Sequence, residues 1–530
     1  MQQLGLAAMQ AWLAGDAAKA ERLARQALDT DPHDANALQV MGVAHLNAAR
    51  LTQAVRYLRA AHEVAPHDPQ ILNTLAVALR RTGDLDGARE AYARAGAMGN
   101  TQAWVNLGNL ERTENKVDAA MAAFTRALAL DPALASAHAG LAQLYEARHE
   151  LKRAREHAQL ALRTDPSNEL ALLALGQVAL RERDWDGAER LLAPLAKDMR
   201  ANPVNRALAI GAIGEARDRA GKPDAAFEAF SESNAILRQR FTEAFNDLSS
   251  PYHPANVQRM IRFAERANFE AWRHPLAYAD AAPVFLVGFP RSGTTLLDQV
   301  LSSHSRVLCL EEKEALAGAV ADLLSEEALS EWDSFPEALI QERRRLYWQH
   351  VEAMGAVVGD RVFVDKLPLN LVLMPAIIRF FPDAKVILAL RDPRDAVLSA
   401  YQQRFGMNAA MAQMLQLESA ARYYDAAMTL AERCRETLGS RLLEIRYEDV
   451  VADLEQAART LAAFLDLAFE PAMLDFNATA RGRDINTPSA RQVVEPIYSR
   501  SVGRWRAYAA QLSPVLPVLA PWTLRFGYDP

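Results

Sequence analysis

One stretch near the middle of the chain, residues 284–297, constrains the fold most. Its first four residues, Val-Phe-Leu-Val, are apolar with β-branched ends and predict a buried strand. The run Gly-Phe-Pro-Arg-Ser-Gly then predicts a tight loop, and a helix is expected from Thr294 to about Ser302. Gly288 and Gly293 can adopt backbone angles closed to other residues, so successive N–H groups can point at one phosphate at the positive end of the helix dipole. The stretch therefore predicts an anion-binding loop.

The loop differs from a loop that cleaves nucleoside triphosphates by one residue type. Glycine, four residues, glycine and two threonines follow the spacing of a P-loop, but Thr294 stands where the lysine that serves a γ-phosphate would be. The only nearby cation is Arg291, inside the loop. We therefore expect the loop to hold a phosphate without cleaving a triphosphate. A kinase-like or degenerate NTPase domain is the alternative.

The segment Pro-Arg-Ser-Gly-Thr-Thr, residues 290–295, resembles the 5′-phosphosulfate loop of sulfotransferases that use PAPS (3′-phosphoadenosine 5′-phosphosulfate). The resemblance implies that PAPS is the sulfuryl donor, that no metal is needed, and that five loop residues bind its sulfonate end. These residues are Arg291, Ser292, Gly293, Thr294 and Thr295.

A second motif, residues 385–399, predicts a strand, an Arg-Asp-Pro-Arg turn and a helix. It resembles the segment of the same family that binds the 3′-phosphate of the adenosine, which implies this role for Arg391 and Ser399. A guanidinium can fork onto two phosphate oxygens, and a hydroxyl adds a further donor. A capping aspartate with solvated arginines is the alternative.

Two candidate catalytic groups lie between these motifs. Residues 307–313, Val-Leu-Cys-Leu-Glu-Glu-Lys, resemble a Cys-Gly-Glu-Glu run of protein-tyrosine sulfotransferases, which implies that Glu312 is the base that deprotonates an acceptor hydroxyl. The alternative is a solvated helix start. Lys366 resembles the catalytic lysine of the family, whose charge offsets that of the leaving phosphate. The alternative is a lysine paired with Asp365 at a strand end.

The resemblance implies further contacts to the nucleotide near the C-terminus. Tyr447 stands where the family has a nucleotide-contacting tyrosine, although a half-buried aromatic at a strand end is the alternative. Residues 492–505 resemble the loop that closes over the nucleotide in bacterial repeat-bearing members, which makes Tyr498, Arg500 and Arg504 candidate contacts. Glu495 departs from the animal enzymes, which have a lysine there, carry a membrane anchor and lack a repeat arm. The acceptor of the animal enzymes therefore cannot be assigned to this chain from the resemblance alone.

The C-terminal half alternates short apolar runs with long helical ones. The runs at 284–287, 362–364, 385–390 and 442–445 predict strands of a mostly parallel sheet covered on both faces. Ligands of such sheets bind at the carboxyl ends of the strands, and most of the unusual polar residues fall there.

The N-terminal half contains a repeat of about 34 residues. Small residues recur in pairs twelve positions apart, and five of the seven units carry a larger residue four positions after the second mark. A small residue allows two helices to cross closely, and prolines at 32, 66, 132 and 166 punctuate the repeat ends. The pattern resembles tetratricopeptide repeats, in about seven helix pairs. We expect the array to bind a protein or peptide partner in its groove. A dimerisation or purely structural arm is the alternative.

Composition narrows the class of protein. The net charge of -7 gives no indication of nucleic-acid binding, and two cysteines in 530 residues exclude a disulfide scaffold. No apolar run is long enough to span a bilayer, the first residues lack the basic region of a signal sequence, and the histidines form no helix-spaced metal pair. We therefore expect a cytoplasmic protein without a metal site.

These features together predict an all-α repeat superhelix followed by a P-loop NTPase-like parallel α/β sulfotransferase domain. We expect the repeat array at 1–238, a helical linker at 239–282 and the sulfotransferase domain at 283–530. The expected function is PAPS-dependent transfer of a sulfuryl group to an acceptor hydroxyl, and the resemblance to protein-tyrosine sulfotransferases favours a tyrosine of a protein or peptide. A glycan or small-molecule acceptor and a non-catalytic nucleotide-binding scaffold are the alternatives.

Overall fold

The computed structural model describes residues 2–273, 282–477 and 501–529. The chain divides into two compact units, Met1–Ala216 and Arg217–Pro530.

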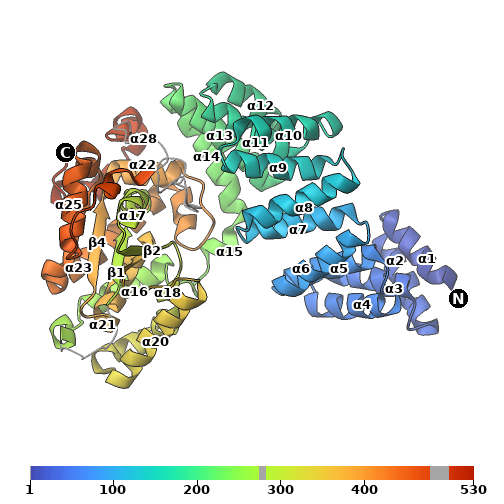
Figure 1. Cartoon of the computed structure of the whole chain (residues 1–530), viewed down its shortest axis with the longest axis horizontal. Helices are drawn as coiled ribbons and strands as arrows, with labels where there is room; N and C mark the ends of the chain where they lie inside the picture. Colours follow the sequence, from blue (N-terminus) through green and yellow to red (C-terminus); the bar gives the residue numbers. More distant parts are fainter. Residues whose placement is uncertain (1, 274–281, 478–500, 530) are drawn as a thin grey trace. The chain divides into compact units, whose positions relative to one another are not determined.

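The first unit is built from helices joined by short turns, drawn from blue to teal in Figure 1. The side chains of Asp16, Asp34 and Asp68 accept hydrogen bonds from backbone N–H groups of the first turn, which explains where these helices begin. The helices are α1 (Gln2–Leu13), α2 (Ala17–Thr30), α3 (Ala35–Asn47), α4 (Leu51–Val64), α5 (Pro69–Thr82), α6 (Leu85–Ala97), α7 (Thr101–Thr113), α8 (Val117–Leu130), α9 (Ala135–Ala147), α10 (Leu151–Thr164), α11 (Glu169–Arg181) and α12 (Trp185–Lys197). The next helix, α13 (Pro203–Arg219), runs from the first unit into the second.

The small residues of the repeat lie where helices cross, as the sequence predicts. A Cβ atom added to Gly108 or to Gly140 would lie 2.7 or 2.5 Å from the ring of Phe124, so this ring fills the space that two glycines leave. In the same way a Cβ at Gly42 would meet Leu58, and one at Gly176 would meet Leu192. The helical repeat architecture and the role of the larger residues as fillers are confirmed.

The second unit contains a five-stranded sheet in the order β2-β3-β1-β4-β5. All four neighbouring pairs are parallel. The strands are β1 (Val284–Gly288), β2 (Val307–Glu311), β3 (Val362–Lys366), β4 (Lys385–Leu390) and β5 (Leu442–Arg446). The sequence predicts four of these strands and misses β2, whose run Val-Leu-Cys-Leu drew attention only through the two glutamates after it.

Alternate strand residues pack into two separate cores, which makes the sheet the middle of three layers. Leu286 and Ile387 face a core formed with α17 and α25, whereas Phe285 and Val386 face a larger core formed with α16, α20, α21 and α23. The helices of this unit are α14 (Pro223–Arg240), α15 (Thr242–Phe245), α16 (Pro254–Ala264), α17 (Thr294–Ser302), α18 (Ala315–Val320), α19 (Glu326–Ser330), α20 (Glu337–Ala353), α21 (Met374–Phe380), α22 (Pro393–Gln402), α23 (Leu417–Leu438), α24 (Tyr447–Ala452), α25 (Leu454–Phe464), α28 (Ala509–Leu512) and α29 (Leu516–Arg525). The expected parallel α/β fold is confirmed.

Helix α14 belongs to the second unit although its sequence continues the repeat pattern. Ala226 and Phe230 on this helix pack into the same core as Phe285 of the central strand. Compactness therefore divides the chain at residue 216, whereas the repeat pattern predicts an array that ends at 238. The two criteria differ because one surface of α14 carries both the repeat signature and the contacts to the α/β domain.

Among the residues that the structure describes, no helix is both long and apolar enough to cross a bilayer.

Substitution of Gly140 tests the crossing at Phe124. We expect Gly140→Ala to destabilise the protein by about 1–3 kcal/mol, because overpacking forces the ring to shift. The preference of helices for alanine over glycine, up to about 1 kcal/mol, offsets part of this cost. Urea denaturation followed by circular dichroism measures it. In a Phe124→Leu background the same substitution should cost at least about 1 kcal/mol less; an equal cost in both backgrounds contradicts the assigned crossing.

Candidate active site

The carboxyl ends of the five strands bring most of the candidate residues to one edge of the sheet. Register pairs Glu311 with Lys366 across β2 and β3, and Gly288 with Ala389 across β1 and β4. Arg391 follows β4 directly, as Tyr447 follows β5. Because parallel strands end at the same edge, motifs separated by as much as 160 residues of sequence are neighbours in space.

The loop after β1 has the backbone conformation that an anion cradle needs. Gly293 caps the N-terminus of α17 in the left-handed region at φ 95°, and a Cβ added there would lie 2.8 Å from Cδ2 of Tyr447. Gly288 approaches Ala389 so closely that a Cβ would lie 2.7 Å from its carbonyl oxygen. Ser292 is buried, and its hydroxyl has no hydrogen-bond partner among the described residues. A buried hydroxyl without a partner in a glycine loop fits an anionic ligand.

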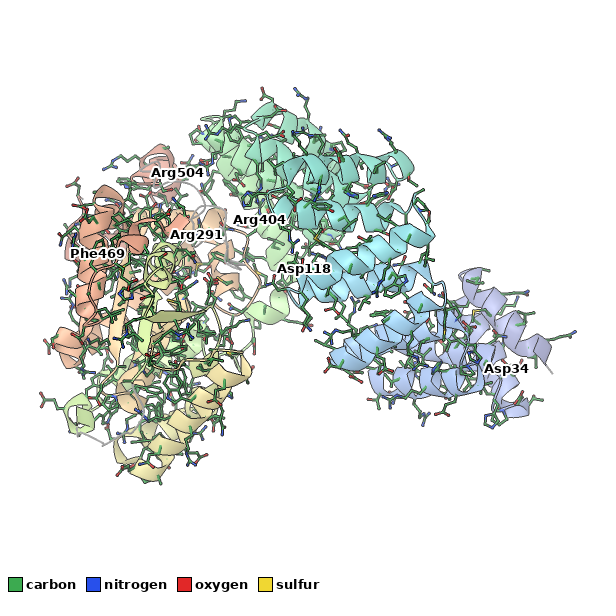
Figure 2. The ribbon with its side chains drawn as sticks, in the orientation of Figure 1. Asp34, Asp118, Arg291, Arg404, Phe469 and Arg504 are labelled. Carbon is green, nitrogen blue, oxygen red and sulfur yellow. The ribbon has the colours of Figure 1, made fainter. Side chains whose placement is uncertain are left out.

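The second motif lies against this loop. Arg291, labelled in Figure 2, donates from Nε to Oγ of Ser399 at 3.2 Å. Arg391 donates to the carbonyl oxygen of Arg291 at 3.0 Å and to that of Ser501 at 2.6 Å, and its guanidinium lies 5.1 Å from the centre of the Tyr447 ring. Two arginines, a serine and a tyrosine predicted from three separate motifs are therefore in direct contact.

Lys366 is the centre of a buried ionic cluster. Its side chain is fully buried, and Nζ donates to Oε1 of Glu312 at 3.0 Å and to Oε1 of Glu311 at 3.2 Å. Consecutive residues of a strand normally point to opposite faces. Here Glu312 adopts a left-handed backbone conformation with φ 47°, while its N–H donates to the carbonyl oxygen of Lys366 at 2.7 Å. The turn in the chain lets both carboxylates reach the same ammonium group.

Charges around Lys366 hold it protonated. Burial alone would lower the pKa of Lys366, but the carboxylates of Asp298, Glu312 and Glu311 raise it above its ordinary value. Lys366 is therefore a positively charged group throughout the neutral range. Asp298, fully buried on α17, was missed by the sequence analysis because a polar residue on a helix of that length gives no sign of its surroundings.

Backbone strain distinguishes this site within the described residues. Residues other than glycine with positive φ are Ala49, Asn115, His149, Arg183, Arg291, Glu312 and Asp466. Five of them directly follow the last turn of a helix, where this conformation is common. Arg291 and Glu312 do not, and both lie among the candidate catalytic and binding residues. Such strain persists only where the surrounding structure enforces it, and it concentrates at functional sites.

Asp365 and Lys366 point to opposite faces of β3. Asp365 is fully buried and accepts hydrogen bonds from the hydroxyl of Tyr347 at 3.0 Å and from Nδ2 of Asn370 at 3.3 Å. Burial raises the pKa of Asp365 to about 7. The alternative in which Lys366 pairs with Asp365 is therefore not what the structure shows, since the partners of Lys366 are the two glutamates.

The remaining predicted contacts lie near the C-terminus. The guanidinium of Arg504 forms an ion pair with Asp218, which also accepts a hydrogen bond from Tyr508 at 2.6 Å. Tyr498 and Arg500, like Glu495, lie outside the described residues. The nucleotide contacts assigned to Tyr498, Arg500 and Arg504 therefore stay predictions. Glu448 was missed: its carboxylate accepts from the N–H of Asp392 at 3.1 Å and from the hydroxyl of Tyr528 at 2.8 Å, and so holds the turn after Arg391.

In the described parts of the chain, no group of three or more histidine, cysteine, aspartate or glutamate residues is arranged to hold a metal ion.

The second unit is a parallel α/β domain with a glycine loop between β1 and α17. Comparison with known proteins shows which families the two units resemble. Residues 283–471 match the model of the sulfotransferase family, and residues 40–103 and 105–169 match that of the tetratricopeptide repeat. The second unit therefore contains a segment similar to the sulfotransferase family, and two segments of the first unit are similar to the tetratricopeptide repeat.

Individual relatives are distant. An uncharacterized protein of Aquifex aeolicus is 29% identical over 313 residues, which are 56% of this chain and 39% of the relative. Protein-tyrosine sulfotransferase 1 of Danio rerio is 26% identical over 48% of this chain and 75% of its own length. Protein-tyrosine sulfotransferase A of Caenorhabditis elegans is 26% identical over 47% of this chain and 67% of its own length. The chain thus spans about two fifths of the Aquifex relative and between two thirds and three quarters of these two enzymes.

Replacement of Lys366 tests the ionic cluster. We expect Lys366→Met to destabilise the folded chain by about 3–5 kcal/mol, because two carboxylates lose the cation that offsets their burial. Denaturant unfolding measures the loss. Lys313→Met, an exposed change next to Glu312, should alter stability by less than about 0.5 kcal/mol. Adding Glu311→Gln to Lys366→Met should restore part of the stability; no recovery contradicts the pairing.

Proposed function

We propose that this protein is a PAPS-dependent sulfotransferase that transfers a sulfuryl group to an acceptor hydroxyl. The observation that carries the proposal is the contact between the two phosphate motifs, in which Arg291 bonds Ser399 and Arg391 bonds the carbonyl oxygen of Arg291, beside the Lys366 cluster at the same sheet edge. The family match of residues 283–471 supports the reaction class.

The residues present fit the donor. The loop Arg291 to Thr295 would hold its 5′-phosphosulfate, because this loop offers backbone N–H groups at the start of α17 and the buried hydroxyl of Ser292. Arg391 and Ser399 would hold the 3′-phosphate, and the Tyr447 ring forms the wall between the two motifs. Bound PAPS supplies an activated sulfuryl group attached to a phosphate that serves as the leaving group.

The chain's own residues then act through proton transfer and charge. Glu312, the more exposed of the two carboxylates, takes the proton of the acceptor hydroxyl. Lys366 keeps its positive charge and stabilises the negative charge that develops on the leaving oxygen. Glu311 holds Lys366 from the neighbouring strand, so the lysine stays in place when Glu312 becomes neutral. No residue in this scheme needs a metal ion.

The acceptor is inferred from the relatives and from the repeat array. The Danio rerio and Caenorhabditis elegans relatives are named protein-tyrosine sulfotransferases, and tetratricopeptide repeats are typical of protein interaction, so we assign a tyrosine of a protein or peptide held by the repeat array. A glycan or small-molecule hydroxyl is the second candidate. We further propose that the enzyme is bacterial and works in the cytoplasm. The alternative role of the repeat array is to form a homodimer.

Sulfate transfer tests the proposal directly. Purified protein is incubated with radiolabelled PAPS and, separately, with a tyrosine peptide pool and a glycan pool. We expect label in the peptide pool, and we expect Glu312→Gln to lower kcat by about 10²–10⁴-fold and Lys366→Met by about 10²-fold. Label in the glycan pool alone overturns the acceptor. Full biological function in both variants would instead support a non-catalytic scaffold.

Gly293 provides a separate test of donor binding. We expect Gly293→Ala to weaken binding of 3′-phosphoadenosine 5′-phosphate by at least about 30-fold, because the added methyl group meets Tyr447 and the left-handed conformation is strained. Isothermal titration calorimetry measures the affinity. The matched control is Gly406→Ala, where an added Cβ meets nothing within 4 Å and φ is not left-handed. Equal affinities of the two variants contradict the placement of the loop.

A further inference from the structure

Helix α22 carries Ser399 on one side and Tyr401 on another. Each residue of an α-helix is rotated by about 100° from the last, so two positions along the helix place side chains on nearly opposite sides. Ser399 contacts Arg291 of the anion-binding loop. Tyr401 contacts helix α14. The helix that supplies the candidate 3′-phosphate contacts is thus held between the loop and α14.

Three contacts from α14 converge on Tyr401. Nδ2 of Asn234, a buried residue, donates to the carbonyl oxygen of Tyr401 at 2.9 Å. Ser231 gives its own hydroxyl hydrogen to the carbonyl oxygen of Phe227 at 2.8 Å, so the Tyr401 hydroxyl is the donor in its 2.8 Å contact with Oγ of Ser231. The ring of Phe227 stacks on that of Tyr401 with centres 5.3 Å apart.

The contact from Asn234 closes the end of α22. The last four carbonyl groups of a helix have no partner within the helix, and that of Tyr401 is one of them because α22 ends at Gln402. A side chain of another helix therefore completes the hydrogen bonding of the phosphate-facing helix. A buried carbonyl group that loses its partner is costly, so α22 is fixed along its axis as well as sideways.

The other end of α22 is fixed by the segment that follows residue 500, and α14 contacts that segment as well. The carboxylate of Asp395 accepts from the N–H groups of Gly503 at 2.6 Å and Trp505 at 2.7 Å. Tyr508 and Arg504 of this segment bond Asp218, near the end of α13, and the ring of Phe227 on α14 lies with its centre 6.4 Å from that of Tyr508. Both ends of α22 are therefore supported from residues 218–234, which lie outside the 283–471 range matched by the sulfotransferase family.

We infer that Asn234 and Ser231 are positioning residues of the nucleotide site, which act through α22 to set the place of Ser399 and Arg391. The inference rests on the proposed nucleotide donor. It makes α14, a helix whose sequence follows the repeat pattern, a part of the donor site. The residues of α14 do not touch the ligand; they hold the helix whose side chains do.

Calorimetric titration of the full-length chain with 3′-phosphoadenosine 5′-phosphate tests the inference. Asn234→Asp keeps the size of the side chain and removes the donor, and we expect it to weaken binding about tenfold. We expect Ser231→Ala to weaken binding about threefold. Gln239→Ala, an exposed change on the same helix, serves as the matched control and should bind as the wild type does. At saturating donor, kcat of Asn234→Asp should stay within about twofold of wild type while KM for the donor rises.

A merely structural role for Asn234 predicts a different result. The thermal midpoint would then fall, while the affinity of the folded protein and its KM for the donor stayed unchanged. In a double-mutant cycle, Ser399→Ala and Asn234→Asp should be less than additive, because the second change acts through the first residue. Additive effects, or wild-type affinity in Asn234→Asp, overturn the inference. If Asn234→Asp does not fold, wild-type affinity of the Ser231→Ala variant overturns the inference.

The outcome separates this inference from the proposed function. Failure of the wild-type chain itself to bind 3′-phosphoadenosine 5′-phosphate overturns the proposed function. Binding by the wild type together with equal binding by the α14 variants overturns only the positioning role.

Discussion

The parallel hydrogen bonding of β1 between β3 and β4 is the constraint on which the rest of the second unit depends. It brings the ends of five strands to one edge, and each strand end supplies one part of the site: the glycine loop, the glutamate pair, the lysine, the arginine turn and the tyrosine. A shift of one residue in the register of β2 against β3 would send Glu311 and Lys366 to opposite faces. The buried ion pair and the register therefore support each other.

The sequence predicts most of the fold because its signals are local. Small residues twelve positions apart mark helix crossings wherever the two helices are adjacent in the chain, and four of the five strands are apolar runs bounded by turns. The strand β2 was missed because its short apolar run ends in two glutamates, which are typical of an exposed helix start. The membership of α14 in the second unit could not be predicted, because Phe227 and Asn234 look like ordinary repeat residues until their partners on α22 are known.

For the candidate site, as for the fold, the sequence predicts the local motifs but not the contacts between them. Resemblance of short motifs to the family implied roles for Arg291, Arg391 and Lys366, but a motif carries no information about its contacts with other motifs. The bond from Arg391 to the carbonyl oxygen of Arg291 depends on a loop in a left-handed conformation that arginine rarely adopts. The same holds for Glu312, whose φ of 47° brings it to the same ammonium group as Glu311. Tertiary contacts enforce both conformations, and no local pattern announces them.

The central claim is that two adjoining anion sites hold the two phosphate ends of one adenosine nucleotide. Hydrogen exchange followed by mass spectrometry, with 3′-phosphoadenosine 5′-phosphate and with adenosine 5′-phosphate, tests it most directly. The account predicts that the first ligand protects both 288–297 and 391–399, whereas the second, which lacks the 3′-phosphate, protects mainly 288–297. Protection of only one segment by the first ligand, or the same pattern with both ligands, would contradict the claim.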